Sequence, residues 1–371
     1  MQNTGKQNEG SRQISLFHYA GAFIAFMCGS GFATGQEVMQ YYVAYGLKGI
    51  AAILTVFILL TYTGIRLVSA GYQQRFAHNS DIFSYYCGFR IGCFFDCFII
   101  FSIYMSFVVI LAGAGATMAQ QFHLPTLIGI VTTGILSCLT VIGGFGRMLR
   151  ILGSLGPAII SIVLLVVISA LVRGTENFSC MDTYITSMHL LRAANHWWLS
   201  AISYVGISMI WLTTFLTKLG VDAQSERLVE RGVFLGTSFF FFGVLLMALA
   251  MMSNIHTIAG AQVPMLILAS QIHPLAATLF AVIISLGIYT ASVPLLWTVA
   301  SRIAGEKESH ICIIAWIATL IGIIIAVTLS FDVLVNLVYV LCGYIGFFLC
   351  IAVVWKDVRT FWSRWQKKFN D

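Results

Sequence analysis

The stretch FMCGSGFATGQEVMQYY, residues 26–42, lies inside a long apolar segment that has the composition of a membrane-spanning helix. It contains Gly29, Gly31 and Gly35 within seven residues, followed by Glu37. Each glycine weakens a helix interior by about 1 kcal/mol relative to alanine, and a carboxylate is costly in hydrocarbon. A helix that only had to cross a bilayer would need neither feature. We therefore expect this stretch to carry function.

The composition of the whole chain is that of an integral membrane protein. Of its 371 residues, 59% are apolar and 9% are charged, whereas a soluble domain has about 25% charged residues. The net charge of +6 comes from residues that fall between the apolar segments. No basic run has interleaved aromatic residues, so the predicted partner is a lipid bilayer and not a nucleic acid.

Ten apolar segments are predicted to cross the membrane as helices, which takes about 20 residues for a hydrocarbon core of about 30 Å. None shows the strict alternation of a β-barrel strand, so the predicted fold class is all-α. The segments run over residues 17–45, 48–71, 90–120, 125–143, 150–172, 197–217, 229–252, 272–302, 310–330 and 333–355.

The lysines and arginines predict the orientation. If the N-terminus is cytoplasmic and the segments alternate, seventeen of the twenty fall on the cytoplasmic side, as the positive-inside rule requires. Residues 1–14 lack a signal-peptide cleavage site and are expected to remain. We predict a multi-pass protein of a bacterial plasma membrane, with both tails, 1–14 and 357–371, in the cytoplasm.

The two halves of the chain have matching spacing. Each of the last five segments begins about 180 to 185 residues after its counterpart among the first five. Because each unit has an odd number of segments, the second would enter the membrane from the opposite side, and such inverted repeats are typical of secondary transporters. The prediction is one transmembrane domain, 1–371, with repeats 15–172 and 196–356.

The first segment is expected to be broken. Thr34 and Glu37 form the pattern of a capping box, T-x-x-E, which marks a helix start. We expect a half-helix over 17–28, an unwound stretch over 29–33 and a second half-helix over 34–45. Unwound backbone at membrane depth is tolerated where it is buried in protein or lines a cavity. The alternative is that the glycines only permit close helix packing.

A broken helix offers binding groups for a zwitterion. The N-terminus of the second half would attract a carboxylate, and the carbonyls ending the first half would attract a cation. The matching segment 197–217 is expected to break at Gly206, beside Tyr204 and Ser208, with an intact helix as the alternative. The candidate substrate-binding residues are Gly29, Ser30, Gly31, Thr34, Tyr104, Tyr204, Gly206 and Ser208.

Other polar residues in the segments have two interpretations each. Tyr104 would point its hydroxyl toward a bound carboxylate or bond an ordinary carbonyl. Thr290 and Ser292, near Pro294, would coordinate Na⁺ or bond back to their own helix. Asp96 and Glu37 would carry a proton or pair with an arginine in a gate, and for Asp96 a plain interfacial ion pair is the other interpretation.

The sequence resembles the bacterial YkvI-type membrane proteins of the amino acid/polyamine/organocation superfamily, which have the LeuT fold, through GSGFATGQE in the first of ten segments and the 5+5 plan. The resemblance implies that Gly29, Ser30 and Gly31 hold the substrate's carboxylate and amino groups, with Tyr104 helping. It also implies a Na⁺ site made by carbonyls of Ala25 and Cys28 with hydroxyls near Thr290. Na⁺-coupled relatives have two adjacent hydroxyl residues, whereas Ala291 separates Thr290 from Ser292 here.

These observations predict a secondary active transporter, a symporter of a small amino acid or related zwitterion driven by Na⁺ or H⁺. The alternative is a nutrient-binding sensor that has a transporter's fold and moves nothing. No metalloprotease, P-loop or paired-acid motif is present, and Ser30 has no evident base, so we expect neither an enzyme nor a cofactor beyond the coupling ion.

Overall fold

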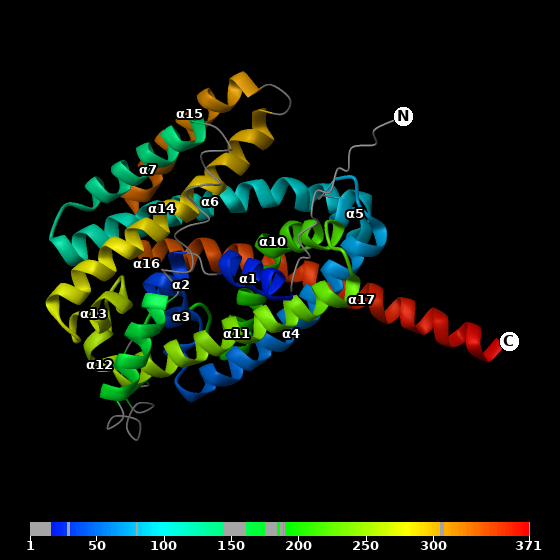
Figure 1. The fold of residues 1–371 in the computed structure, drawn as a ribbon, viewed down its shortest axis with the longest axis horizontal. Helices are drawn as coiled ribbons and strands as arrows, with labels where there is room; N and C mark the ends of the chain where they lie inside the picture. The colour runs from blue at the N-terminus through cyan, green and yellow to red at the C-terminus, as the bar shows by residue number, and fades with distance from the viewer. Residues whose placement is uncertain are drawn as a thin grey trace, which may run out of the picture.

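The computed structural model describes residues 16–27, 30–78, 81–143, 161–174, 184–185, 188, 190–304 and 308–370. All regular elements in these residues are helical, as the sequence predicts (Figure 1). In chain order they are α1 (Leu16–Met27), α2 (Ser30–Thr34), α3 (Gln36–Tyr41), η1 (Val43–Tyr45), α4 (Leu47–Gln74), α5 (Asp81–Cys87), α6 (Phe89–Phe122), α7 (Thr126–Ile142), an unlabelled helix (Ser161–Arg173), α10 (Trp197–Val221), α11 (Glu226–Ser253), α12 (Ile255–Ile258), α13 (Pro264–Ser270), α14 (Pro274–Ala304), α15 (Glu308–Thr328), α16 (Phe331–Leu334), the π-helix η3 (Val335–Tyr339) and α17 (Val340–Asn370).

Seven described helical segments are long and apolar enough to cross a membrane. They correspond to α4, α6, α10, α11, α14, α15 and the stretch from α16 into α17. Two shorter apolar helices, Thr126–Ile142 and Ser161–Arg173, match two further predicted segments. The first predicted segment is divided into short helices. The count of ten crossings and the inverted repeat remain predictions.

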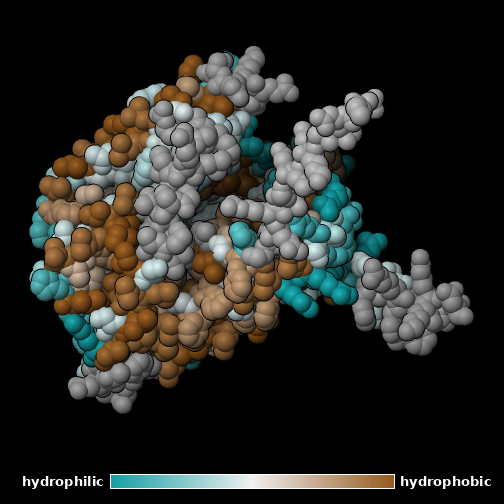
Figure 2. All heavy atoms as spheres, in the orientation of Figure 1, coloured by the Kyte–Doolittle hydropathy of each residue, from teal (hydrophilic) through white to brown (hydrophobic). Residues whose placement is uncertain are grey.

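The surface agrees with a membrane location. Apolar side chains cover most of the face seen in Figure 2, and polar ones gather toward the end from which the C-terminal helix projects. Leu54, Phe242 and Ile324 are among the exposed large apolar residues. Such a surface would be costly in water but is expected against lipid tails.

The long helices pack in two groups. One group consists of α6, α7, α14 and α15, which contact one another, and the other consists of α1, α4, α10 and α11. Figure 1 shows the first group at the upper left and the second in the centre and below. The divided first segment touches both, because α1 packs on α11 while α2 contacts α14 and α6. This position places α2 and α3 at the junction of the two groups.

Candidate substrate site at the interrupted first span

The first span is interrupted, as predicted, and the interruption that the structure describes lies at Gly35 and not over residues 29–33. α1 ends at Met27, α2 occupies Ser30–Thr34, and Gly35 turns the chain with a left-handed φ of 81° before α3 begins. A side chain is disfavoured at this φ. A Cβ at Gly35 would also lie 2.8 Å from Met265 Cγ of α13. Glycine is therefore required at position 35 on both counts.

Two predictions about this stretch are corrected. Residues 30–33 are helical in α2 and not unwound, and α3 has no side-chain cap. Thr34 instead donates its hydroxyl to the Gly31 carbonyl at 3.0 Å. The left-handed turn at Gly35 breaks the regular geometry that a capping box over positions 34–37 needs, so Glu37 cannot serve as the reciprocal cap.

Some predicted residues lie outside the described part of the chain. Cys28 and Gly29 are not described, and for Ala25 and Ser30 only the backbone is, in α1 and α2. The proposed Na⁺-binding carbonyl of Cys28 and the backbone of Gly29 therefore stay predictions.

The Glu37 side chain folds back from α3 onto α2. A Cβ built on Gly31 would overlap Glu37 Oε1 and Cδ, so the carboxyl group lies directly against the Gly31 backbone. Glu37 is only 7% exposed. Among the described residues, no hydrogen bond or ion pair to the Glu37 carboxylate is found. A buried carboxylate without a partner is rare because its desolvation is costly.

Aromatic side chains surround this carboxylate. Tyr41 and Tyr42, at the end of α3, are fully buried. Their rings lie 5.2 and 5.3 Å from the ring of Tyr204 on α10. Tyr339 of η3 packs edge-on against Trp211 with ring centroids 5.1 Å apart. Glu37 is within electrostatic range of the hydroxyls of Tyr41, Tyr42 and Tyr339.

Two buried hydroxyls within electrostatic range of the carboxylate, those of Tyr41 and Tyr42, have no hydrogen-bond partner among the described residues. The Tyr41 hydroxyl lies near Ser203 but not at hydrogen-bonding geometry. The buried Ser208 hydroxyl on α10 has no partner in this part of the chain either. Ser208 follows Tyr204 by one helical turn, so both occupy the same face of α10. Native interiors pair nearly all such groups, so unpaired ones call for an explanation, and a functional role is one of the ordinary ones.

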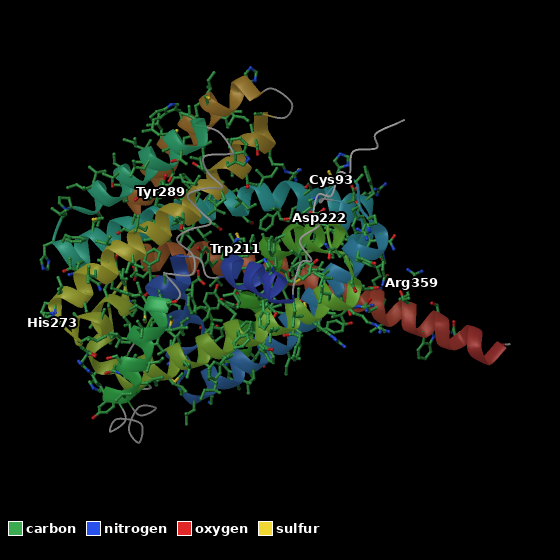
Figure 3. The ribbon with its side chains drawn as sticks, viewed as in Figure 1. Cys93, Trp211, Asp222, His273, Tyr289 and Arg359 are labelled. Atoms are coloured by element: carbon green, nitrogen blue, oxygen red, sulfur yellow. The ribbon has the colours of Figure 1, made fainter. Side chains whose placement is uncertain are left out.

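Sequence reasoning found Glu37, Tyr204 and Ser208 but missed the other aromatic residues. Trp211 lies near the centre of the molecule in Figure 3, one turn beyond Ser208 on α10. Tyr41 was detectable, since it follows Glu37 by four residues in a helix. Tyr339 belongs to a π-helix, which its sequence does not signal but which is often found at functional sites.

The predicted break at Gly206 is not observed. α10 is a continuous helix of 25 residues, so the intact alternative is correct. Gly206 instead allows close packing, because a Cβ there would overlap the Gly343 carbonyl of α17. A Cβ at Gly346 would in turn overlap the Gly206 carbonyl. One glycine without a capping residue does not interrupt a helix when a neighbouring backbone packs against it.

The hydroxyls of Tyr104, Thr290 and Ser292 make ordinary hydrogen bonds to backbone carbonyls. Tyr104 donates to the Ala318 carbonyl of α15 at 3.0 Å. Thr290 bonds back to the Gly287 carbonyl at 2.9 Å, and Ser292 to that of Tyr289 at 2.8 Å. Ser292 also shares a hydrogen bond of 2.5 Å with Ser137 of α7. The structure thus brings Glu37, Tyr204 and Ser208 into one region but does not turn the Tyr104 hydroxyl toward it.

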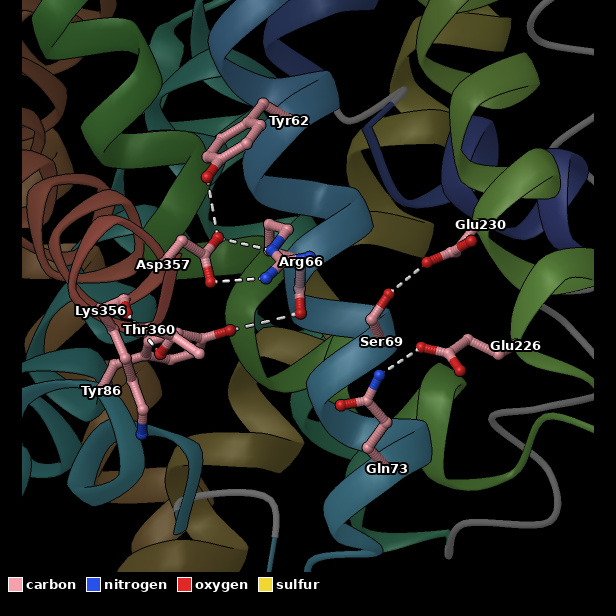
Figure 4. Close-up of polar contacts among 10 residues, drawn as sticks. All are labelled: Tyr62, Arg66, Ser69, Gln73, Tyr86, Glu226, Glu230, Lys356, Asp357 and Thr360. Carbon is pink, nitrogen blue, oxygen red and sulfur yellow. Dashed lines mark hydrogen bonds and ion pairs between the residues drawn. The ribbon is translucent and has the colours of Figure 1, made fainter. Parts of the chain in front are cut away.

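The other acid proposed for coupling, Asp96, forms an ion pair with Arg302 at the end of α14. It does not pair with Arg66, which forms two bonds to Asp357 of α17, one of them 2.6 Å long (Figure 4). Tyr62 donates to the same carboxylate at 2.8 Å. These pairs lie at the predicted cytoplasmic ends of the helices, and the arginine that pairs with Asp96 is Arg302.

A polar clasp holds α3 and η1 to the loop 190–196 and to α16 and η3. We use "clasp" for Gln40, Tyr45, Asn336 and the loop residues they bind. Gln40 Nε2 donates to the Asp332 backbone carbonyl at 2.9 Å. The backbone carbonyl of Gln40 accepts from the Ala193 amide at 3.1 Å. Asn336 Nδ2 lies 3.1 Å from Gln40 Oε1.

Tyr45 completes the clasp. Its hydroxyl donates to the Ala194 carbonyl at 2.6 Å and accepts from the Ala194 amide at 2.8 Å. The Arg192 guanidinium lies 5.7 Å from the Tyr45 ring centroid. Segments far apart in sequence are thereby joined over α3, a contact that no local pattern indicates.

No protein-family model matches the chain. It is 25% identical over 233 residues to YkvI, an uncharacterized membrane protein of Bacillus subtilis (strain 168), a match that covers 62% of this chain and 63% of YkvI. It is 21% identical over 345 residues to the uncharacterized protein YyaD of the same organism, covering 91% of this chain and 95% of YyaD. The match to YkvI therefore spans less than two thirds of that relative.

Two solved structures share the fold at 13% sequence identity. Mhp1 in an inward-facing conformation matches with a TM-score of 0.51 over 88% of this chain and 74% of Mhp1. A manganese transporter of Eremococcus coleocola matches with a TM-score of 0.50 over 91% of this chain and 77% of that one. At this level of identity the similarity shows the fold that the three chains share. The chain is therefore similar in sequence to YkvI, and it shares with Mhp1 and the manganese transporter the LeuT fold.

Proposed function

We propose that the protein is a secondary active transporter that moves a small amino acid or related zwitterion across a bacterial plasma membrane. The observation that carries this proposal is the Glu37 carboxylate, buried against Gly31 where the first span is interrupted. Interrupted helices at the junction of two helix groups are where transporters of this fold bind solutes.

The proposed mechanism is alternating access. The group of α1, α4, α10 and α11 would rock against the group of α6, α7, α14 and α15, with the solute held between them. The clasp over α3 would close the outer side in the conformation described, and its hydrogen bonds would break when that side opens. The fold similarity supports such a motion.

The coupling ion is proposed to be H⁺ in preference to Na⁺. Glu37 is a buried group that can gain and lose a proton. The hydroxyls of Thr290 and Ser292 are already bonded to carbonyls of their own helix. Because both hydroxyls already have hydrogen-bond partners, we do not propose a Na⁺ site at these two side chains.

Counterflow in proteoliposomes tests the proposal. Vesicles loaded with unlabelled alanine, leucine or phenylalanine should accumulate the radiolabelled form of the transported one, and an imposed pH gradient should drive net uptake without Na⁺. A protein that binds an amino acid but shows no counterflow would be the nutrient sensor that the sequence left as an alternative. Uptake that needs Na⁺ and ignores the pH gradient would reject proton coupling.

A further inference from the structure

We propose that Glu37 is the counter-ion for the ammonium group of the solute, and that this ammonium and a proton compete for the same carboxylate. The site would then recognise an organic amine by its positive charge. Binding of the amine would release the proton, so the two would move by exchange and not together. This inference rests on the proposed function only in using the same site.

The charge balance of the site supports a cationic ligand. No Lys, Arg or His in the described part of the chain forms an ion pair with Glu37. The described groups within electrostatic range of it are tyrosines: Tyr41 and Tyr42 from the end of α3 and Tyr339 from η3, with Tyr204 of α10 packed against the first two. A substrate carboxylate placed here would meet a like charge, whereas an ammonium would find its only compensating charge.

The remaining neighbours bring no second charge to the carboxylate. Around Gly35, the side chains are Met251 of α11 and Met265 of α13. Asp332 of α16 contacts Gln40 through its backbone carbonyl, and no ion pair or hydrogen bond joins its carboxylate to Glu37 among the described residues. One carboxylate can neutralise one positive charge, so a proton and an ammonium cannot occupy it together.

The aromatic rings favour an organic cation over a metal ion. Rings attract a cation within about 6 Å of their faces. Tyr41 and Tyr42, whose rings both pack on that of Tyr204, lie within electrostatic range of the carboxylate. Their hydroxyls, unpaired among the described residues, offer acceptors for the N–H groups of an ammonium. No group of three or more His, Cys, Asp or Glu in the described residues would hold a metal.

The proposed step conserves protons and charge. The neutral Glu37 carboxyl gives up its O–H proton to solvent on one side of the membrane, and the incoming R–NH₃⁺ forms an ion pair with the resulting carboxylate. On the other side a proton binds the carboxylate, the ion pair breaks, and the ammonium leaves with its own protons. No bond to carbon changes and no other reactant is needed.

The test compares three amino acids with analogues that keep only the amino group or only the carboxyl group. Alanine, leucine and phenylalanine are each matched with the decarboxylated amine (ethylamine, isopentylamine, 2-phenylethylamine) and the deaminated acid (propionate, 4-methylpentanoate, 3-phenylpropionate). Melting temperature is measured on the full chain in detergent, since a ligand that binds the folded form raises it. Manganese(II) chloride serves as the metal probe.

We expect at least one amine to raise the melting temperature at least as much as its parent amino acid, and the acids and manganese to have no effect. The amine's affinity should fall as the pH is lowered, up to about tenfold per unit, because protons compete for Glu37. Amine added to weakly buffered acidic protein should release about one proton per molecule bound.

Glu37→Gln should abolish the amine effect and the proton release. Glu226→Gln removes a partly exposed acid at the start of α11 that bonds Gln73 on α4 (Figure 4), and should retain both. Stabilisation by the acids or by manganese, an amine effect that is independent of pH, or no effect of any amine would each overturn the proposal. Because binding is measured without vesicles, a failure of transport alone would reject the proposed function and leave this inference standing.

Discussion

The carboxyl group of Glu37 lies against the backbone of Gly31, so that a methyl group at position 31 would occupy the place of Glu37 Oε1. Two residues six apart in sequence thus depend on each other because of the left-handed turn at Gly35. Because of this contact, a single added methyl group at Gly31 tests the site.

Gly31→Ala should displace Glu37 from the site. The added methyl leaves no room for the carboxyl group, so we expect at least a tenfold loss of amine affinity and of counterflow, with overpacking costing about 1 to 3 kcal/mol of stability. Amine-induced thermal shifts and counterflow measure the effect. Gly21→Ala is the control, because a Cβ at Gly21 in α1 meets nothing within 4 Å. Equal binding and transport by both variants would contradict the assigned position of Glu37.

Gly206→Ala should act on helix packing and not on substrate contact. Its Cβ would overlap the Gly343 carbonyl and force α10 away from α17, which we expect to cost about 1 to 3 kcal/mol of stability. The melting temperature without ligand is the measurement. Gly243→Ala in α11 is the matched control, since its nearest neighbour would be Phe32 Cζ at 3.9 Å. An unchanged melting temperature in Gly206→Ala would argue against the close packing.

Tyr45→Phe should loosen the clasp. It removes both hydrogen bonds to Ala194 and leaves that amide without its acceptor, at a cost of about 1 to 3 kcal/mol. Hydrogen exchange at residues 193–194 should therefore quicken by about 5- to 100-fold. Tyr104→Phe loses one hydrogen bond elsewhere, to Ala318, and should leave this exchange and the amine binding as in the unaltered protein. No change at 193–194 in Tyr45→Phe would show that the clasp does not hold the loop.

Asp357→Asn should weaken the attachment of α17 to α4. It removes the carboxylate that accepts from Arg66 and Tyr62. Since the Arg66 side chain is 44% exposed, we expect a loss of only about 1 kcal/mol, which should shrink in high salt. Thermal unfolding at low and high NaCl gives the comparison. Asp222→Asn, in an exposed pair with Lys218, should cost less, and an equal or larger loss there would contradict this ranking.

The amino-acid sequence by itself determined the helical membrane class and indicated a candidate site. An apolar composition with spaced charged residues requires helices in a membrane, because an α-helix satisfies its own backbone in lipid. The glycines and glutamate of residues 29–37 were conspicuous because both are unfavourable in such a helix. That local conflict predicted the interruption of the first span.

Only the tertiary structure decided how these residues are used. The turn at Gly35 is fixed by methionines from α11 and α13, so the pattern T-x-x-E could not reveal that its cap is not formed. Gly206 permits a helix contact with α17 instead of a break, and Tyr339 lies 302 residues beyond Glu37 in the sequence but within electrostatic range of it. Helix–helix contacts are made between residues remote in sequence, and their packing overrides local propensity.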